Sequence, residues 1–429
     1  MNIVNKILRG DKVIWILSLL LGIISLVVVY SAASALVVRN YEGSTGRMLI
    51  KHAGTLLLGF IMMFIAYKID YRHFAQIFTI IMWLCIPLLL YTMLFGNNLN
   101  QASRTINILG FSFQPSEWAK IALLTYLSRE LVIMGEHLKN FKQVLLKIGL
   151  PILLITGLIF TENLSTAAIL LVACLVLLYI GRVKFTHIML ILAIGVGMLG
   201  IYIIFDMAKT KVANNKAKKA QTELAITNGA TTEEFEPRKN RIQTWIGRID
   251  AMFEPKDEDY DPFDDHHYQQ TYAKIAVATS SFIGKGPGKS EQRNFLPHPY
   301  SDFIFAIIVE EYGLLGALIV LLIYIILFTR VIKIFTKRPN TFGAYMTYSL
   351  VFLIIMQAMI NMGVSIGLLP VTGQPLPFVS MGGTSMMATG FILGMILSVT
   401  KSIEKDELAE KELTTNNTDE NGLSVENSD

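Results

Sequence analysis

Ten apolar segments divide the chain, and each approaches the roughly 20 residues that an α-helix needs to cross the hydrocarbon core of a bilayer. Only 16% of the residues are charged, a fraction that is low for a soluble protein and favours a membrane protein. The predicted fold class is therefore an all-α polytopic membrane protein. The predicted spans are 13–36, 52–69, 75–95, 116–133, 145–162, 164–181, 186–205, 303–329, 342–366 and 385–400.

The number of spans depends on how two of these segments are interpreted. The run from 13 to 29 follows three basic residues, as in a secretory signal peptide, but it is longer than the apolar region of such a peptide and further spans follow it. We therefore predict an uncleaved first membrane helix. The apolar block 145–181 is interrupted by Glu162 and Asn163, where we predict a tight helical hairpin.

Lysine and arginine residues near the span ends orient the chain. They lie before the first span and in the loops after spans two, four, six and eight, so the positive-inside rule places both termini in the cytoplasm. The segment after span seven begins with several lysines, but long loops translocate largely regardless of charge. The predicted parts are a cytoplasmic N-terminus (1–12), spans one to seven (13–205), a large extracytoplasmic loop (206–301), spans eight to ten (302–400) and a disordered cytoplasmic tail (401–429).

Three carboxylates lie in or beside the eighth predicted span, between Pro297 and Gly316. Asp302 lies where the long polar loop meets the apolar run, and an ionisable side chain at the mouth of a membrane helix is costly and suggests function. Glu310 and Glu311 follow on the same run, and in a helix Glu310 would lie about 12 Å deeper than Asp302. These acids predict chemistry at a membrane surface, although the sequence assigns no role to Glu310 or Glu311.

The fourth predicted span begins with a proline and Glu117, which suit the N-terminal end of a helix. Lys120 follows about one turn later. One interpretation is structural: Lys120 pairs with Glu117 or extends its ammonium group to the membrane surface. The other interpretation is that Lys120, with Arg104 in the preceding loop, binds the pyrophosphate of a lipid. The sequence alone leaves both interpretations open.

Proline and glycine residues interrupt the region between spans nine and ten. Pro370, Pro375, Pro377 and a pair of adjacent glycines prevent one continuous helix. Irregular backbone at membrane depth is tolerated where it is buried in protein or lines a cavity. We predict a re-entrant segment at 367–384, with either a purely structural role or a place at a cavity.

Two further motifs fall short of known ligand sites. The segment from Gly284 to Ser290 is not a phosphate-binding loop, because Ile283 occupies the position of that loop's first glycine. The acidic segment 257–267 lacks the glycine and the closing glutamate of a calcium-binding loop. The two cysteines lie inside apolar runs and give no metal-ligand spacing. We therefore predict no dedicated metal site.

Taken in order, these segments resemble the SEDS family (shape, elongation, division and sporulation). The resemblance covers essentially the whole chain and depends on the order and spacing of several motifs. The matching motifs are Gln114-Pro115-Ser116-Glu117 with Lys120, Arg241-Ile242 with Trp245, Gln269-Gln270, Gly284-Lys285-Gly286 with Gly288 and Ser290, Leu296-Pro297, Ser301-Asp302-Phe303-Ile304-Phe305, Glu310-Glu311, and Pro370 to Ser380 with Gly382-Gly383. The chain departs from the family pattern at 162–167, at 297–300 and at Met381, and none of these departures changes Asp302.

The resemblance implies a peptidoglycan glycosyltransferase that polymerises lipid II, with Asp302 as the essential catalytic residue. Lipid II carries its sugar in α linkage to a pyrophosphate and the glycan product is β-linked, so a single inversion with Asp302 as general base is sufficient. Undecaprenyl pyrophosphate would leave, and a divalent cation (Mg or Mn) could share in binding the pyrophosphates. The candidate substrate-binding residues are Lys120, Arg104, Glu117, Arg241, Ser301 and Gln270.

Other functions remain open on the sequence alone. A lipid II flippase would also need a polar cavity, but the two halves of the chain show no clear inverted repeat, and Asp302 is placed at the outer mouth rather than at the midplane. A non-catalytic scaffold would not need Asp302 and the basic residues. Within the family, the charged tail and the unusual turn between spans five and six favour the division type (FtsW-like) over the elongation type (RodA-like).

The expected surroundings follow from the same resemblance. It implies the bacterial inner (cytoplasmic) membrane, a class B penicillin-binding protein transpeptidase that crosslinks the new strands, and other divisome proteins for the division type. The net charge of +4 is small and the basic residues mostly flank apolar runs, so the sequence argues against a nucleic acid partner.

Overall fold

The computed structural model describes residues 9–40, 45–95, 97–99, 102–108, 111–228, 247, 268–296 and 299–425. Long α-helices make up most of this part of the chain, as expected where the backbone must satisfy its own hydrogen bonds inside a bilayer. The elements are α2 (Lys12–Asn40), α3 (Thr45–Lys68), α4 (Tyr71–Phe95), β1 (Asn97–Leu99), β2 (Ala102–Ile108), β3 (Phe111–Phe113), α5 (Pro115–Met134), η1 (Gly135–Lys139), α6 (Phe141–Val144), η2 (Leu145–Gly149), α7 (Leu150–Glu162), α8 (Leu164–Ile180), α9 (Phe185–Asn228), α11 (Tyr268–Ala278), η3 (Gln292–Asn294), α12 (Ile304–Lys337), α13 (Phe342–Ser365) and α14 (Gly383–Val425).

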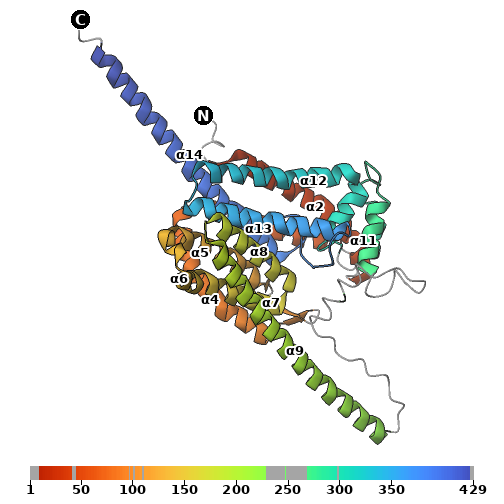
Figure 1. Ribbon diagram of the computed structural model, residues 1–429. Helices are drawn as coiled ribbons and strands as arrows, with labels where there is room; N and C mark the ends of the chain where they lie inside the picture. The colour runs from red at the N-terminus through yellow and green to blue at the C-terminus, as the bar shows by residue number, and fades with distance from the viewer. Residues whose placement is uncertain are drawn as a thin grey trace.

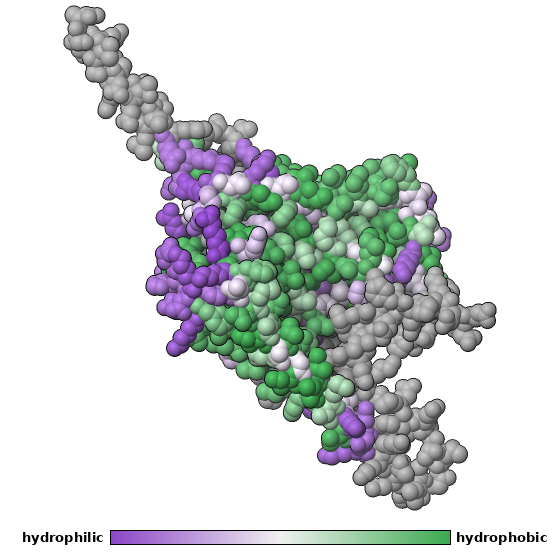
Figure 2. All heavy atoms as spheres, in the orientation of Figure 1, coloured by the Kyte–Doolittle hydropathy of each residue, from purple (hydrophilic) through white to green (hydrophobic). Residues whose placement is uncertain are grey.

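The long helices pack side by side into a bundle (Figure 1). α3 lies along α14, α12 packs against both α2 and α13, and α13 also contacts α5. Large apolar side chains such as Leu19, Ile80 and Leu322 remain exposed on the outside of the bundle. Figure 2 shows this apolar surface across the body, with hydrophilic residues gathered at the end where α5 and α6 lie. The pattern is that of a protein surrounded by lipid.

Within the described residues, eight helices are long and apolar enough to cross a membrane, namely α2, α3, α4, the continuous stretch Phe141–Glu162, α9, α12, α13 and α14. α8 is also apolar but has only 17 residues, and the 20-residue α5 carries four charged side chains. α5 and α8 contact each other and α13. All ten predicted segments therefore fall on helices, and the predicted all-α polytopic fold class is confirmed.

The hairpin predicted in the block 145–181 is visible at Asn163. α7 ends at Glu162 and α8 begins at Leu164, and Asn163 between them has an extended backbone (φ −154°, ψ 103°). The Asn163 side-chain oxygen accepts hydrogen bonds from the backbone N–H groups of Ser165 (3.1 Å) and Thr166 (3.3 Å). This cap satisfies two N–H groups that the start of a helix leaves without a partner. The two helices then pack against each other.

Two helices run further than the sequence predicts. α9 continues to Asn228, well into the predicted extracytoplasmic loop, because this stretch is rich in alanine, lysine and other strong helix formers. α14 continues to Val425 through the tail predicted to be disordered from 401. An ion pair between Lys337 and Glu407 (2.6 Å) ties this extension to the end of α12. The described backbone of the tail up to Val425 is helical, whereas the sequence predicts disorder there.

Three short strands precede α5. They form an antiparallel sheet in the order β1-β2-β3, with Ile106 opposite Phe113 in the second pairing. The strand β3 ends one residue before Gln114, and Pro115 then starts α5, so the sheet leads directly to the motif that contains Glu117 and Lys120.

Candidate functional site

Asp302 lies at the start of α12, between an irregular loop and a buried apolar run. The residues that follow it, from Phe303 to Glu311, are all buried, whereas Asp302 itself is partly exposed. The Ser301 hydroxyl donates a hydrogen bond to Asp302 Oδ1 (2.9 Å). The carboxylate is thus held at the edge of the bundle by a helix that cannot move without exposing its apolar side chains.

The irregular segment 366–382, between α13 and α14, holds the loop that carries Asp302. The Ser380 hydroxyl donates to the carbonyl oxygen of Ser301 (2.6 Å), and the N–H of Met381 donates to the carbonyl oxygen of Tyr300 (2.9 Å). The Ser380 oxygen also accepts from the N–H of Leu376 (2.7 Å), which fixes its direction. The segment predicted to be re-entrant therefore contacts the candidate catalytic residue's own loop.

Asn361 joins three parts of the site from inside α13. Its side-chain amide donates to the carbonyl oxygens of Asp302 (2.8 Å) and Gln374 (2.8 Å). The Gln374 amide in turn donates to the hydroxyl of Thr166 in α8 (2.7 Å). All these contacts are buried or nearly so, which makes them strong constraints on geometry. α8, α13 and the irregular segment 366–382 are thereby coupled to the backbone of Asp302.

The backbone of the irregular segment also approaches the carboxylate itself. Gly373 has φ +65°, and a β-carbon placed on it would lie 3.5 Å from Asp302 Oδ2. A glycine adopts this conformation without strain. The positive φ of Gly373 therefore lets the backbone of the irregular segment pass close to the Asp302 carboxylate.

The opposite side of the irregular segment is held by helices α2, α3 and α12. The Tyr324 hydroxyl donates to the carbonyl oxygen of Pro377 (2.5 Å), and the Ser25 hydroxyl donates to that of Val379 (2.7 Å). His52 Nε2 lies 2.8 Å from the same Ser25 oxygen. Because the Ser25 hydroxyl has one proton and gives it to Val379, His52 Nε2 must donate to Ser25, which fixes the tautomer of the histidine.

Glu117 and Lys120 form a second charged site, in the first turns of α5. Lys120 Nζ lies 2.7 Å from Glu117 Oε1, and the two side chains are only 2% and 10% exposed. This contact is the pairing of Lys120 with Glu117, which is the structural one of the two interpretations that the sequence leaves open. Burial of both charges makes each depend on the other, because a single buried charge without its partner is strongly unfavourable.

The structure brings together some of the predicted site residues but not all. Ser301 contacts Asp302, and Glu117 contacts Lys120. Gln270 is buried on α11. Arg104 lies in β2, where only the backbone is described, and Arg241 lies outside the described residues.

The sequence did not identify the residues that position Asp302, namely Asn361, Gln374, Ser380, Ser25 and His52. Two of them carried a signal, because Asn361 and His52 are strongly polar side chains inside predicted membrane spans, where such residues usually have a partner or a function. Serine and glutamine in irregular backbone carry no such signal. Their importance comes from contacts with residues that are distant in the sequence.

The helix α12 is broken at Gly313, where φ is 69° and ψ is −164°. A break leaves carbonyl and N–H groups without intrahelical partners. The N–H of Lys285 donates to the carbonyl oxygen of Glu310 (3.0 Å), and the N–H of Leu314 donates to the carbonyl oxygen of Ser281 (3.4 Å). The N–H of Gly286 likewise donates to the carbonyl oxygen of Glu311, and the N–H of Leu315 donates to that of Phe282. The loop that contains the glycine-rich motif therefore completes the broken helix.

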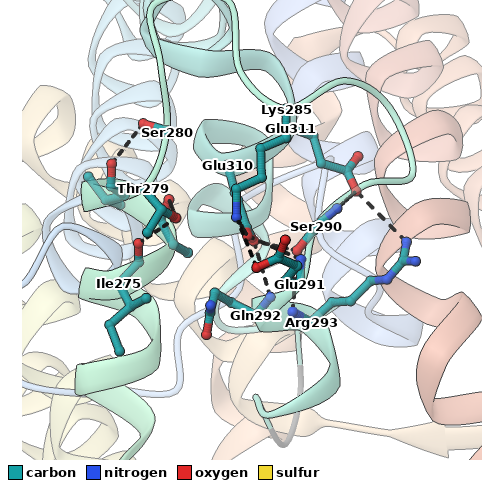
Figure 3. Close-up of polar contacts among 12 residues, drawn as sticks. Ile275, Thr279, Ser280, Lys285, Ser290, Glu291, Gln292, Arg293, Glu310 and Glu311 are labelled. Atoms are coloured by element: carbon teal, nitrogen blue, oxygen red, sulfur yellow. Dashed lines mark hydrogen bonds and ion pairs between the residues drawn. The ribbon is translucent and has the colours of Figure 1, made fainter.

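The Glu310 carboxylate, which is fully buried, lies inside this junction (Figure 3). It accepts hydrogen bonds from Lys285 Nζ (2.8 Å), from the Ser290 hydroxyl and from the N–H groups of Glu291 (3.1 Å) and Gln292 (3.4 Å). The bond to Glu310 raises the pKa of Lys285, because it favours the protonated ammonium group. Glu310 is therefore a structural carboxylate that holds the loop on α12.

Glu311 extends the same junction to α2. Its carboxylate accepts from the Ser31 hydroxyl and from the N–H of Ser290 (3.3 Å), and Arg293 Nη1 lies 3.9 Å away. Arg293 also donates to the carbonyl oxygen of Ser31 (3.1 Å). Figure 3 shows Glu310 and Glu311 on either side of Ser290. The two acids to which the sequence assigned no role thus connect α2, α12 and the loop 281–293.

Gly313→Ala is expected to destabilise this junction strongly. Its β-carbon would lie 2.4 Å from the carbonyl oxygen of Phe282, and φ of +69° disfavours any side chain, so we expect a loss of about 2–5 kcal/mol in thermal unfolding of the detergent-solubilised protein. Gly288→Ala is the matched control, because Gly288 also has a positive φ (+76°) but nothing within 4 Å of its β-carbon, and it should cost about 1 kcal/mol. Equal losses in the two variants would contradict the close packing inferred at the break.

The chain is similar to known proteins over almost its whole length. The family model described as a cell cycle protein family, FtsW/RodA/SpoVE, matches residues 11–405. A probable peptidoglycan glycosyltransferase FtsW of Geobacter sulfurreducens is 28% identical over 411 residues, covering 94% of this chain and 98% of that protein. The stage V sporulation protein E of Bacillus subtilis is 27% identical over 398 residues, covering 91% of this chain and 97% of that protein.

Two solved structures share the fold. One comes from a study of the structural coordination of polymerization and crosslinking by a peptidoglycan synthase complex; it has a TM-score of 0.65 and 21% identity, and covers 92% of this chain and 98% of the other. The other is the rod shape determining protein RodA of Thermus thermophilus, with a TM-score of 0.58 and 18% identity, covering 92% of this chain and 97% of that one. At these identities the likeness concerns the fold alone.

Proposed function

The chain belongs to the FtsW/RodA/SpoVE family, and we propose that it is a peptidoglycan glycosyltransferase that polymerises lipid II into glycan strands. Relatives that match almost its whole length are named as probable peptidoglycan glycosyltransferases. The observation that carries the proposal is the partly exposed carboxylate of Asp302, positioned at the start of an apolar helix by Ser301, Asn361 and the irregular segment 366–382.

Asp302 acts as the general base in this proposal. It removes the proton from the 4-hydroxyl of the acceptor sugar, whose oxygen attacks the anomeric carbon of the donor sugar. The bond between that carbon and the lipid pyrophosphate breaks, and undecaprenyl pyrophosphate leaves with the electron pair. Attack from the face opposite the leaving group converts the α linkage into a β linkage in one step. A general base in this role contributes typically about 10²–10⁴-fold to the rate.

The leaving pyrophosphate needs positive charge to stabilise it. Lys120, Arg104 and Arg241 are the proposed sources, with Glu117 holding Lys120 in place through the buried ion pair. Ser301 and Gln270 are proposed to contact the sugar or its carrier. Among the described residues, no three His, Cys, Asp or Glu side chains are grouped to hold a metal ion. Where a divalent cation takes part, we propose that the pyrophosphate oxygens are among its ligands.

We further propose a division-type role with a crosslinking partner. Several of the similar curated proteins carry the name FtsW, which supports the division type over the elongation type. One structure with the same fold comes from a complex that couples polymerization with crosslinking, which supports a class B penicillin-binding protein transpeptidase as partner. Other divisome proteins would then share the same membrane.

One experiment tests the proposed function directly. The purified full-length protein is incubated with lipid II, alone and together with its cognate transpeptidase, and glycan polymers are separated by length. Polymer formation supports a glycosyltransferase. Movement of lipid II across a vesicle membrane without any polymer in either condition would instead identify a flippase. If neither activity is found in either condition, a non-catalytic scaffold would be the better interpretation.

The proposed orientation places Asp302 outside the cytoplasm and makes a separate prediction. Lys289 in the loop 281–293 and Thr336 near the end of α12 are both exposed and lie toward opposite ends of α12. Single cysteines at these positions, in a Cys85→Ala, Cys174→Ala background, can be probed with an impermeant thiol reagent on cells with a permeabilised outer membrane. We expect labelling at Lys289→Cys and none at Thr336→Cys. The reverse pattern would place Asp302 in the cytoplasm, where glycan strands are not assembled.

A further inference from the structure

A cavity of about 360 Å³ lies at the end of the bundle away from Asp302. It is formed where α5 ends, where α8 turns into α9 and where α12 turns into α13. Asp302 precedes the first residue of α12, and Thr166 near the start of α8 joins the Asp302 network. The cavity and Asp302 therefore lie at opposite ends of the same helices, about 25 Å apart along the length of α8.

The rim of this cavity carries an excess of positive charge. Lys139, Arg182 and Lys184 line it, with Glu136 as the one acid among the lining residues. Lys139 pairs with Glu136 and lowers the pKa of that carboxyl group, so these two charges largely cancel. Within the described part of the chain, neither Arg182 nor Lys184 has an ion-pair partner. Among the described residues, these two cations at the cavity thus have no acid to balance them.

Other residues that line the cavity are apolar. Leu131, Val132 and Leu138 line it beside the charged residues, and Val132 is 41% exposed on the outer surface of the bundle. A site with cations at the rim and apolar side chains beside them matches a molecule with a charged head and an apolar body. Basic pockets between membrane helices bind anionic lipid head groups in this manner.

Two non-glycine residues at the cavity, Arg182 and Asn340, have a positive φ. Arg182 follows the end of α8 with φ of +59°, a position at which glycine is usual, and its N–H donates to the carbonyl oxygen of Tyr179 (3.1 Å). Asn340 on another wall also has a positive φ (+62°), and its side-chain oxygen accepts from the Tyr345 hydroxyl (2.9 Å). Asparagine adopts a positive φ readily, whereas arginine does so at a cost. An arginine in place of a glycine at this turn sets a guanidinium group at the rim of the cavity.

We propose that this cavity binds the phosphate head group of an anionic membrane phospholipid. The Arg182 guanidinium and the Lys184 ammonium contact the phosphate, since arginine matches phosphate geometry with two parallel hydrogen bonds. Val132 contacts the first carbons of the acyl chains. Given the proposed orientation, the lipid belongs to the cytoplasmic leaflet. The site is separate from polymerisation, and its test does not depend on enzymatic activity.

The test measures thermal unfolding of the full-length protein in nanodiscs of phosphatidylcholine alone and of an equal mixture with phosphatidylglycerol. We expect the wild type to unfold at a higher temperature in the mixture, because bound lipid stabilises the folded state. Arg182→Gly should lose most of this shift, with lipid affinity about tenfold lower. In phosphatidylcholine alone, Arg182→Gly should unfold at the same or a higher temperature, because glycine accepts a positive φ without strain. Lys184→Gln should lose a smaller part of the shift.

Two controls make the result decisive. Lys142 is exposed on the same side but does not line the cavity, so Lys142→Gln should keep the full shift. A loss in Lys142→Gln as large as in Arg182→Gly would mean that general surface charge causes the effect, and it would overturn the proposal. An unchanged shift in both Arg182→Gly and Lys184→Gln would overturn it too. If inorganic phosphate in phosphatidylcholine nanodiscs reproduces the Arg182-dependent shift, the ligand is a soluble phosphate and the lipid assignment fails.

Discussion

Asp302→Asn is expected to lower lipid II polymerisation by about 10²–10⁴-fold, because an amide cannot remove a proton from the acceptor hydroxyl near neutral pH. The asparagine keeps the shape of the aspartate and can still accept the hydrogen bond from the Ser301 hydroxyl. The thermal unfolding temperature in detergent should therefore remain close to that of the wild type. Asp302→Ala should lose activity to a similar extent. The measurement is the amount and length of glycan polymer made from lipid II by each purified variant.

A matched control separates loss of the base from a general effect of losing a carboxylate. Glu407 lies on the extension of α14, in a largely exposed pair with Lys337 (2.6 Å). Glu407→Gln should polymerise lipid II at the wild-type rate, because an exposed ion pair contributes little to stability. Near-normal polymer from Asp302→Asn would rule out Asp302 as the general base, whatever the control shows.

Lys120→Ala is expected to cost about 3–5 kcal/mol of stability, because it leaves the Glu117 carboxylate buried without its partner. The same variant should polymerise poorly even at temperatures at which it remains folded, if Lys120 also contacts the lipid pyrophosphate. Lys337→Ala is the exposed counterpart, and it should cost no more than about 1 kcal/mol. The measurements are thermal unfolding in detergent and polymerisation at a temperature below the unfolding transition.

A double variant distinguishes the structural role of Lys120 from its proposed role in binding. Glu117→Gln combined with Lys120→Met removes both buried charges, and such replacements are often neutral or stabilising. We expect the double variant to recover most of the stability lost in Lys120→Ala while its polymerisation stays low. Recovery of activity together with stability would show that the pair serves the fold alone.

The sequence alone determined the helices of this protein. A bilayer leaves the backbone no water for its hydrogen bonds, so each apolar segment of sufficient length must become a helix, whatever surrounds it. All ten predicted segments lie on helices, and Asn163 ends one helix and begins the next at the predicted position. The sequence also marks Asp302 as a candidate, because a charge beside an apolar run is costly in a membrane protein, and its catalytic role stays a prediction.

Local sequence patterns were less informative where the same residues are compatible with two different structures. The spacing of Glu117 and Lys120 allowed an ion pair, but only the packing around α5 decided that both side chains are buried. The extension of α14 is rich in acids and lysines, which is compatible with both disorder and helix. The structure describes this stretch as a continuation of α14 to Val425, and the exposed Lys337–Glu407 pair contributes little to that outcome.

The arrangement of the site was decided only by the tertiary structure. The break of α12 at Gly313 follows no proline, and its missing hydrogen bonds are completed by a loop about 30 residues earlier in the chain. Asn361 reaches Asp302 across 59 residues, and Gln374 reaches Thr166 across 208. A hydrophobic pattern determines which segments enter the bilayer, since it depends on near neighbours. It does not determine which polar groups meet inside the bundle, because those contacts exist only once the helices have packed.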